Sequence, residues 1–194
     1  MVHKKYFPII ISSPSGAGKN SVCDMVVEKC ANVVYSISYT TRPIRSTEQE
    51  GIDYHFVSKK KFQKMIDKDA FLEWAQYLGY YYGTSKKMVE EVIADEKYII
   101  LAIETKGAKQ FMKRRPDALS IFIFPPSMKE LERRLRNRKT DAPKVIETRL
   151  ENAKHEIVDC IYYDRFVIND NLDRVSNEVI TLIEKKSKGK DIYG

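Results

Sequence analysis

Residues 13–21 have the sequence Ser-Pro-Ser-Gly-Ala-Gly-Lys-Asn-Ser and stand between the apolar stretch FPIIIS (7–12) and a helical pattern that begins at Lys19. A strand, a glycine-containing turn and a helix in this order are typical of a phosphate-binding loop. In such a loop, backbone N–H groups surround a phosphate and the helix N-terminus favours its negative charge. Lys19 adds a compact positive charge for the outer phosphates. The segment therefore predicts a strand–loop–helix unit that binds a phosphorylated ligand.

The loop departs from the usual pattern at two positions. In the pattern G-x-x-x-x-G-K-[ST], Ser13 stands where glycine is usual, and Asn20 stands where a hydroxyl is usual, although Ser21 follows at once. The alternative is a plain strand–turn–helix corner with an incidental lysine, but strand, glycines, lysine and helix are all in register. The candidate phosphate-binding residues are Ser15, Gly16, Ala17, Gly18, Lys19, Asn20 and Ser21.

Apolar strand patterns alternate with helical patterns along most of the chain, which predicts an α/β fold with a parallel sheet flanked by helices. Near-continuous apolar runs such as KYIILAI and LSIFIF are typical of strands covered on both faces. The expected strands are residues 7–12, 33–37, 97–103, 119–124 and 164–168. The expected helices are residues 19–30, 106–115, a helix opened by a Ser127–Glu130 capping box and running through Arg138, residues 143–160, and a last helix capped by Asp170.

Residues 38–96 interrupt this alternation. The segments IDYHFVS (52–58) and AFLEWAQY (70–77) are half-polar, aromatic-rich strand patterns around a short helix that begins after Ser58. We therefore expect a small mixed β subdomain inserted into the parallel-sheet core. An insertion beside a nucleotide loop is a natural place to bind a second substrate. Within it, Trp74 and Tyr77 are expected to be core residues.

The charge balance favours an anionic partner. The 194 residues, enough for one good-sized domain, carry 34 Lys and Arg against 27 Asp and Glu, for a net charge of +7. Nucleic acid is not the expected partner, because the aromatic residues do not interleave with a basic stripe. A membrane is not expected either, because no apolar run approaches the length that crosses a bilayer. Phosphorylated small molecules therefore remain as the expected partners.

Cysteine and histidine usage argues against disulfides and structural metals. There are three cysteines, an odd number, and no C-x-x-C pair, which suits a reducing cytoplasm and buried thiols. The histidines His3, His55 and His155 show no metal-ligand spacing. We expect a cytoplasmic protein without a structural metal site.

Several segments together resemble the guanylate kinase family, the nucleoside monophosphate kinases that act on GMP. The resemblance extends over about residues 7–185 and rests, in order, on SPSGAGK, SYTTRPIR, GIDYHFVS, FLEWAQYLGYYYG, IFIFPPSMKELERRLRNR and VIND. It implies one domain over residues 1–194 with a P-loop kinase core at about 1–37, 97–138 and 150–194. It also implies a GMP-binding insertion at about 38–96 and a short mobile lid at about 139–149.

On the acceptor side, the resemblance implies that Arg42 and Arg45 hold the GMP phosphate together with Tyr54 and Tyr82. Guanidinium groups suit this task because they make paired, charge-assisted hydrogen bonds to phosphate, and phenol hydroxyls donate without adding charge. The resemblance also assigns Gly83, Glu104 and Arg149 to the GMP site.

Glu73 matches the guanine-reading position of the family. The N1–H and N2–H₂ groups of guanine are adjacent donors, and a carboxylate offers two acceptors, whereas N1 of adenine is itself an acceptor. Ser38 and Thr84 can donate their hydroxyls to guanine O6. The three residues are therefore expected to select GMP over AMP.

On the donor side, the resemblance implies that Arg134 and Arg138 bind ATP and that Asn169 lies near its adenine. It further implies that Arg138 and Arg149 clamp the transition state as the lid closes. The expected catalytic residues are Lys19, Arg42, Arg138 and Arg149. Mg²⁺ is expected to bind mainly through phosphates and water, near Ser21, with no dedicated protein ligands.

The segment LAIETKG (101–107) departs from the family pattern LDIDxQG. Ala102 stands where the first acid is usual, Glu104 keeps the second acid, and Lys106 replaces the usual glutamine. An acid at the end of this strand can support the water ligands of Mg²⁺. The departure at Ala102, with Asn20, therefore bears on metal handling and rate rather than on guanine recognition.

The expected reaction is ATP + GMP ⇌ ADP + GDP, with dGMP as a second acceptor, in a monomer or homodimer. One alternative is a related domain that has lost catalysis and binds phosphopeptides, which the departures at Asn20 and Ala102 favour. Another is a P-loop kinase for a different phosphorylated small molecule, for which Glu73 and Thr84 would have nothing to recognise.

Overall fold

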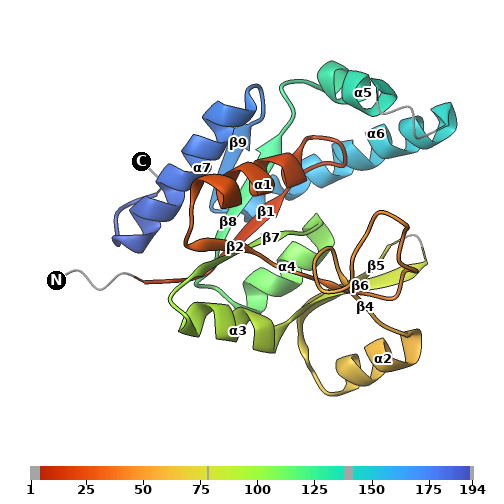
Figure 1. Ribbon diagram of the computed structural model, residues 1–194. Coiled ribbons are helices and arrows are strands. Elements are labelled where there is room, and N and C mark those ends of the chain that lie inside the picture. Colours follow the sequence, from red (N-terminus) through yellow and green to blue (C-terminus); the bar gives the residue numbers. More distant parts are fainter. Residues whose placement is uncertain (1–4, 78, 138–141, 193–194) are drawn as a thin grey trace.

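The computed structural model describes residues 5–77, 79–137 and 142–192. A five-stranded sheet in which all pairs are parallel forms its centre, in the order β2-β7-β1-β8-β9 (Figure 1). The strands are β1 (Pro8–Ser12), β2 (Val33–Tyr35), β7 (Tyr98–Ala102), β8 (Leu119–Phe124) and β9 (Arg165–Ile168). The first strand of the chain is therefore the middle strand of the sheet, between two strands that come much later in the sequence.

Helices cover both faces of this sheet. The isoleucines of β1 show how the core divides: Ile9 and Ile11 pack into one core cluster and Ile10 packs into the other, as the two-residue alternation of a strand requires. Residues of α1 and α7 fill the first cluster, and residues of α3 and α4 fill the second. The helices are α1 (Lys19–Lys29), α3 (Lys86–Ala94), α4 (Thr105–Arg114), α5 (Met128–Asn137), α6 (Pro143–Val158) and α7 (Leu172–Ser187), with the 3₁₀ helix η1 (Asp159–Tyr162) after α6.

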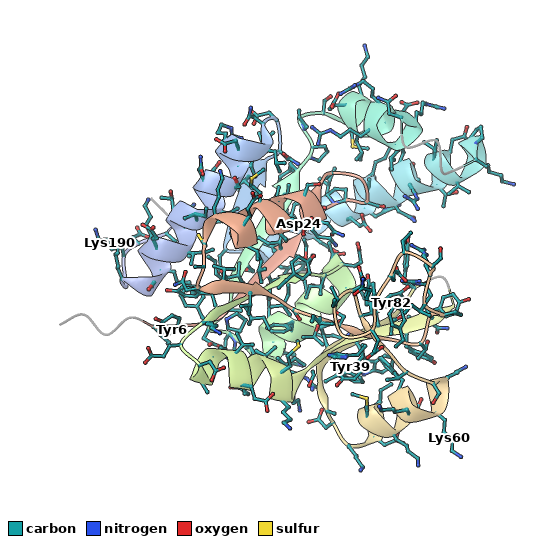
Figure 2. The ribbon with its side chains drawn as sticks, in the orientation of Figure 1. Tyr6, Asp24, Tyr39, Lys60, Tyr82 and Lys190 are labelled. Atoms are coloured by element: carbon teal, nitrogen blue, oxygen red, sulfur yellow. The ribbon has the colours of Figure 1, made fainter. Side chains whose placement is uncertain are left out.

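A second, four-stranded sheet is inserted between β2 and β7, as predicted for residues 38–96. Its strands are β3 (Tyr39–Thr40), β4 (His55–Phe56), β5 (Phe71–Tyr77) and β6 (Tyr80–Ser85), and α2 (Lys59–Asp67) packs beside them. The strand order is β4-β3-β6-β5, with β3 and β4 parallel and the other pairs antiparallel. Figure 2 shows Tyr39 and Tyr82 on this small sheet, below the large one.

The α/β class and the mixed insertion are confirmed, but some local predictions are wrong. The side chain that caps α7 is that of Asn171, which accepts from the N–H of Arg174, and Asp170 instead accepts from Asn171 N–H and the Arg174 guanidinium. The predicted helix 143–160 ends at Val158 and continues as η1. Ser127 caps α5 through Glu130 N–H as expected.

Two other features of the fold concern the sequence predictions. The carboxylate of Glu130 accepts from Arg133 and Arg134 instead of completing a capping box. In the part of the chain that the structure describes, no helix combines the length and the apolar character that spanning a membrane requires.

Candidate active site

The phosphate-binding loop follows β1 and ends at α1, as the sequence predicts. Gly16 and Gly18 both have φ of 96°, a conformation that favours glycine, and Gly18 caps α1 without a side-chain bond. Neighbouring side chains close the space above both glycines: a Cβ at Gly16 would lie 2.7 Å from Cδ2 of Leu135, and a Cβ at Gly18 would collide with Nδ2 of Asn169. A side chain at either position would therefore strain the backbone and displace a neighbouring side chain.

The loop encloses a polar cavity of about 180 Å³. All of the predicted phosphate-binding residues line it except Ala17, whose side chain is fully buried. At its edge, Nζ of Lys19 lies 2.9 Å from Oε1 of Glu104, which is half exposed. Lys19 thus points into the cavity and is neutralised there by a solvated carboxylate.

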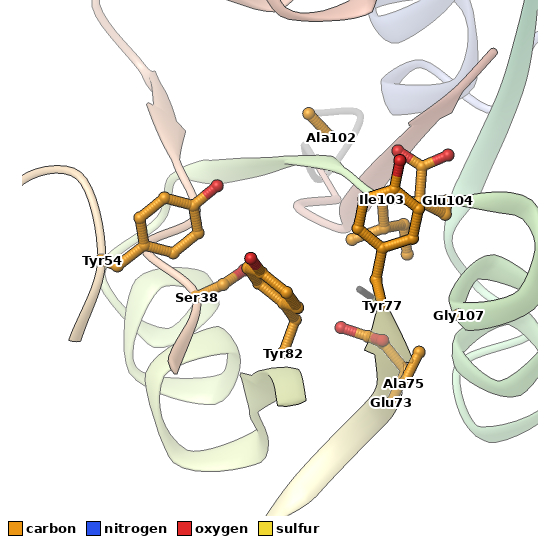
Figure 3. A pocket seen from close by; sticks show the side chains of 10 residues that line it. All are labelled: Ser38, Tyr54, Glu73, Ala75, Tyr77, Tyr82, Ala102, Ile103, Glu104 and Gly107. Carbon is orange, nitrogen blue, oxygen red and sulfur yellow. The ribbon is translucent and has the colours of Figure 1, made fainter. Parts of the chain in front are cut away.

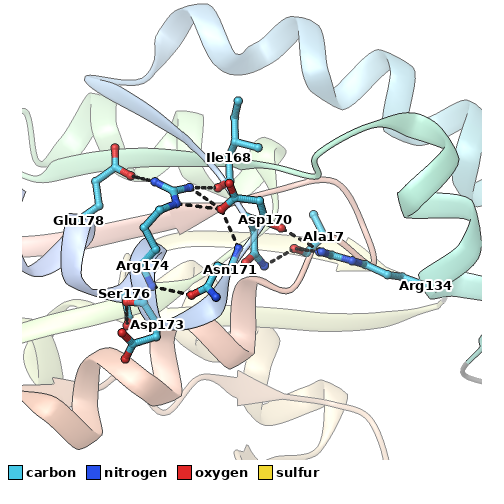
Figure 4. A network of polar contacts seen from close by, with 10 residues as sticks. Ala17, Arg134, Ile168, Asp170, Asn171, Asp173, Arg174, Ser176 and Glu178 are labelled. Atoms are coloured by element: carbon cyan, nitrogen blue, oxygen red, sulfur yellow. Dashed lines mark hydrogen bonds and ion pairs between the residues drawn. The ribbon is translucent and has the colours of Figure 1, made fainter.

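Arg134 and Asn169, both predicted to bind ATP, support the loop through the carbonyl oxygen of Ala17. Nδ2 of Asn169 donates to this oxygen at 2.8 Å and a guanidinium nitrogen of Arg134 donates at 3.3 Å, while a second nitrogen of Arg134 donates to the Asn169 carbonyl at 2.9 Å (Figure 4). Both residues also line an open cleft of about 540 Å³ beside the loop. The remaining residues of the cleft are Gly16, Gly18, Ser21, Asn137, Asp170 and Leu172, of which the last three were not predicted as site residues.

A second cavity of about 240 Å³ lies between the two sheets (Figure 3). It brings together Ser38, Tyr54, Glu73, Tyr82 and Glu104, all predicted for the GMP site. The other lining residues are Ala75, Tyr77, Ala102, Ile103 and Gly107. Glu104 lines this cavity and the cavity of the phosphate-binding loop, so the two meet at its carboxylate.

Glu73 lies on β5 in this cavity and is 5% exposed. The hydroxyl of Thr84, on the paired strand β6, donates to its Oε1 at 2.7 Å. Burial raises the pKa of Glu73 to about 7, against the opposing effects of hydrogen bonds from Thr84 and the charge of Lys19. A carboxyl group with a pKa near neutrality changes its charge readily in response to what enters the cavity.

Gly107, on α4, is a site residue that the sequence analysis did not assign. A Cβ at this position would lie 2.5 Å from Oε2 of Glu73. A glycine in the interior of a helix costs about 1 kcal/mol relative to alanine, and such a residue usually has a packing reason. Here the reason is the room that Glu73 occupies, and the unusual glycine in TKGAK was the available signal.

Arg42 and Arg45 meet at a carboxylate that the sequence analysis also missed. The guanidinium of Arg42 makes two hydrogen bonds to Glu48, at 2.7 and 3.0 Å, and Glu48 also accepts from the backbone N–H of Arg45 at 2.9 Å. The Arg42 guanidinium carbon lies 5.5 Å from the ring centre of Tyr54, whose ring is 5.9 Å from that of Tyr82. This cluster lies beside the Glu73 cavity, and hydrogen bonding to Arg42 lowers the pKa of Glu48.

Three predicted site residues remain: Arg138, Arg149 and Gly83. Arg138 lies outside the described residues. Arg149, on α6, is close enough to Tyr77 for its charge to oppose the rise in the Tyr77 pKa that burial causes. Gly83 packs behind the cavity, where a Cβ would be 3.1 Å from the rings of Phe62 and Phe71.

Two expectations about single residues have different outcomes. The expectation that Tyr77 is a core residue is wrong, since Tyr77 is 48% exposed and lines the cavity. The three cysteines are free, and burial raises the pKa of the Cys23 thiol to about 12, so this thiol is not a nucleophile.

Comparisons with known proteins extend over nearly the whole chain. The sequence model of a family described as guanylate kinase matches residues 5–186. The guanylate kinase of Carboxydothermus hydrogenoformans is 43% identical over 185 residues, which cover 95% of this chain and 91% of that protein. The guanylate kinase of Hydrogenovibrio crunogenus is 46% identical over 170 residues, which cover 88% of this chain and 83% of that protein.

A solved structure agrees with these sequence matches. The crystal structure of guanylate kinase from Anaplasma phagocytophilum aligns with a TM-score of 0.78 and 29% identity, over 96% of this chain and 88% of that chain. The similarity therefore extends over nearly the whole chain, and is not limited to the phosphate-binding loop.

Proposed function

This chain belongs to the guanylate kinase family, and from that premise we propose that it transfers the γ-phosphoryl group of ATP to GMP, forming ADP and GDP. The observation that carries the proposal is the meeting of two cavities at Glu104: a phosphate-binding loop on one side and a pocket with a buried carboxylate on the other. Two nucleotides bound in them would face each other through their phosphates.

GMP enters the cavity between the sheets. The carboxylate of Glu73 accepts from N1–H and N2–H₂ of guanine. The hydroxyl of Ser38 donates to O6, and the hydroxyl of Thr84 turns from Oε1 of Glu73 to O6 as well. Support comes from the burial of Glu73 and from the space that Gly107 leaves for Oε2. A buried acceptor pair of this kind rejects adenine, because it would be left partly unpaired.

The GMP phosphate lies at the rim of this cavity, beside Tyr54 and Tyr82. Arg42 and Arg45 turn from Glu48 to the phosphate, which offers them the same paired acceptor geometry with more negative charge. Glu48 thus holds the two arginines in place until the nucleotide arrives. The absence of the 2′-hydroxyl from dGMP removes none of these contacts, so dGMP is a second acceptor.

ATP places its phosphates in the loop of residues 13–21 and its adenosine in the open cleft beside Arg134 and Asn169. Backbone N–H groups and the N-terminus of α1 stabilise the phosphates. Lys19 exchanges its ion pair with Glu104 for the outer phosphates. Arg138 and Arg149 neutralise the charge that develops on the transferred group, and the lid of residues 139–149 excludes water.

Mg²⁺ is proposed to accompany ATP. The phosphate-loop cavity offers the hydroxyl of Ser21, the amide of Asn20 and the carboxylate of Glu104, which is already paired with Lys19. The described residues contain no group of three acidic, cysteine or histidine side chains that could hold a metal. This donor set fits an ion held by phosphates and water, which would supply further neutralisation of the phosphate charge.

Phosphoryl transfer then needs position more than covalent help. A phosphate oxygen of GMP approaches the γ-phosphorus in line, and no protein base is required. We propose that the reaction takes place in the cytoplasm, where the three free cysteines stay reduced, and that the protein acts as a monomer or homodimer.

An ADP-release assay across acceptors tests the proposal. With GMP, dGMP, AMP, CMP and UMP offered in turn, and Mg²⁺ titrated, we expect turnover with GMP and dGMP only, and none without the metal. Turnover with AMP equal to that with GMP would refute the role of Glu73. No turnover with any acceptor would refute the kinase function itself.

A further inference from the structure

A third, smaller cavity of about 60 Å³ adjoins both of the cavities described above. It shares Asn20 with the cavity of the phosphate-binding loop, and it shares Ser38, Tyr54, Ala102 and Ile103 with the cavity between the sheets (Figure 3). The remaining residues of its wall are Tyr35, Ser36, Asp53 and Leu101. The space is therefore next to the binding places proposed for both nucleotides.

One buried hydroxyl group in the wall of this cavity lacks a partner. Ser36 directly follows β2, and its backbone N–H donates to the carbonyl of Ile100 on β7 at 2.9 Å. The residue is 6% exposed, and its Oγ is buried without a hydrogen-bond partner among the described residues. Buried polar atoms of this kind are usually bound to a protein group or to ordered water. The adjoining cavity has the volume to hold such water.

The charge of the wall favours a cation and its water. Among the described residues that line the cavity, Asp53 alone is charged, and Asn20 and Ser36 add neutral oxygen atoms. The cavity of the phosphate-binding loop differs, because Lys19 lines it. Oxygen atoms with a single carboxylate suit a hydrated Mg²⁺ ion, which keeps several water ligands when it binds to a protein.

Asp53 is exposed, but the loop before β4 fixes its place. Its Oδ2 accepts from the backbone N–H of Gln49 at 2.8 Å, and its own N–H donates to the carbonyl of Gln49 at 3.1 Å. On the other side of the cavity, β7 ends at Ala102, which contributes a methyl group where the pattern LDIDxQG has an acid. The carboxylate that reaches this space therefore comes from the loop and not from the end of the strand.

We propose that Asn20, Ser36 and Asp53 hold water ligands of the Mg²⁺ ion that accompanies ATP, and that Asp53 takes over the task of the acid that is missing at position 102. Asp53 is thus a positioning residue: it orients water, while the phosphates bind the ion. This inference rests on the proposed function, because it assumes that ATP brings the ion to the loop.

A titration with Mn²⁺ tests the role of Asp53. Mn²⁺ prefers the same oxygen ligands as Mg²⁺, and the sharp electron paramagnetic resonance signal of the free ion is lost on binding. The titrated sample is the complex of the protein with GMP and AMP-PNP, a non-hydrolysable ATP analogue. We expect Asp53→Asn to weaken Mn²⁺ binding by at least about tenfold, as is usual when a group that orients a metal ligand is lost.

Two further measurements separate this effect from damage to the fold. Asparagine keeps an acceptor for the N–H of Gln49, so calorimetry without metal should show that Asp53→Asn binds AMP-PNP and GMP no more weakly than the wild type. Asp95→Asn is the matched control, since Asp95 is an exposed carboxylate after α3. Its variant should bind Mn²⁺ like the wild type.

A second substitution tests whether Asp53 replaces an acid at position 102. Ala102→Asp places a carboxylate in the wall of the same cavity, so the double variant Asp53→Asn, Ala102→Asp should regain most of the lost Mn²⁺ affinity. Ser36→Ala should weaken Mn²⁺ binding between about twofold and tenfold, the range that one neutral hydrogen bond contributes.

The outcomes distinguish this inference from the proposed function. Equal Mn²⁺ affinity of the wild type and Asp53→Asn overturns the inference, and so does a loss in Asp53→Asn that Ala102→Asp leaves unchanged. Failure of the wild type to bind AMP-PNP both with and without metal overturns the proposed function instead.

Discussion

Glu73 is the residue on which the choice of purine depends, and its charge is set by its surroundings. In the free protein, burial holds its pKa at about 7, so the carboxylate form is only partly populated near neutrality. The guanine donors stabilise the carboxylate form, so GMP binding releases a proton from Glu73. GMP affinity therefore gains from a rise in pH through 7.

Glu73→Gln tests this at the level of one side chain. The variant keeps one acceptor but loses the charge, so kcat/KM for GMP should fall about 100-fold, because charge-assisted hydrogen bonds contribute roughly 1.5–3 kcal/mol each. KM for ATP should change less than about twofold, since the ATP site is separate. Steady-state kinetics with each substrate varied in turn give both numbers.

The pH dependence separates charge from shape. Between pH 8 and pH 6, the wild type should lose up to about tenfold in GMP affinity that Glu73→Gln does not lose. Glu91 is an exposed carboxylate of α3 that pairs with Lys87. Its variant Glu91→Gln is the control and should show the pH dependence of the wild type. Parallel pH profiles for wild type and Glu73→Gln would contradict the assignment.

Helix α4 leaves room for the carboxylate of Glu73 because residue 107 has no side chain. Gly107→Ala should raise the helix propensity of α4 by about 1 kcal/mol, but its Cβ would come within 2.5 Å of Oε2 of Glu73. We expect KM for GMP to rise at least about tenfold while ATP binding is retained. Lys106→Ala, an exposed neighbour on the same helix, is the control. Unchanged GMP kinetics in Gly107→Ala would show that Glu73 does not need this space.

The elements of the large sheet could be predicted because the residue types in each element reflect its burial or its backbone conformation. The apolar runs in β7 and β8 reflect burial on both faces, and the glycines of the loop reflect a backbone with positive φ. The strand β6 and the helix α3 were not singled out. Their residues are mixed in polarity, because β6 lines a cavity and α3 buries a single side chain completely.

The partners of site residues were harder to predict than the residues themselves. Nothing near Glu48 in the sequence indicates that it holds Arg42, because both lie in an irregular loop. Nor does the sequence place Gly107 against Glu73, since that contact depends on how α4 packs on β5. The prediction that Asp170 caps α7 failed for a different reason. Asp170 and Asn171 are equally good caps by residue type, and the Arg174 guanidinium, one turn along the helix, engages Asp170 and leaves Asn171 to cap the backbone.

For the molecule as a whole, the carboxyl groups whose pKa is raised to about 7, those of Glu73 and of Glu156 on α6, make stability depend on pH. Below pH 4.5, the pKa of Glu73 in the unfolded chain, this side chain is protonated in both the folded and the unfolded state. As the pH rises from there towards 7, the unfolded chain loses the proton first, and the free energy of unfolding falls. For Glu73 the loss is on the order of 3 kcal/mol, and Glu156 adds in the same direction. Carboxylates with lowered pKa, such as Asp117, act oppositely and lose their contribution below their unfolded value.

We therefore expect the ligand-free protein to be most stable near pH 5 and to lose stability up to about pH 7. Urea unfolding at intervals between pH 5 and pH 8 measures the free energy of unfolding along this range. The double variant Glu73→Gln, Glu156→Gln should remove most of the decline. A wild type whose stability is constant, or rises, over this range would contradict the expectation.

The contact between Asn169 and the loop bears on the order in which the site forms during synthesis. The loop is made within the first 21 residues of the chain, yet the amide that holds the carbonyl of Ala17 comes 152 residues later. The middle strand β1 likewise waits for neighbours that begin at Tyr98 and Leu119. During synthesis, the loop thus leaves the ribosome long before the residues that complete it, and a nascent chain gains its full nucleotide site only after Asn169 has been made.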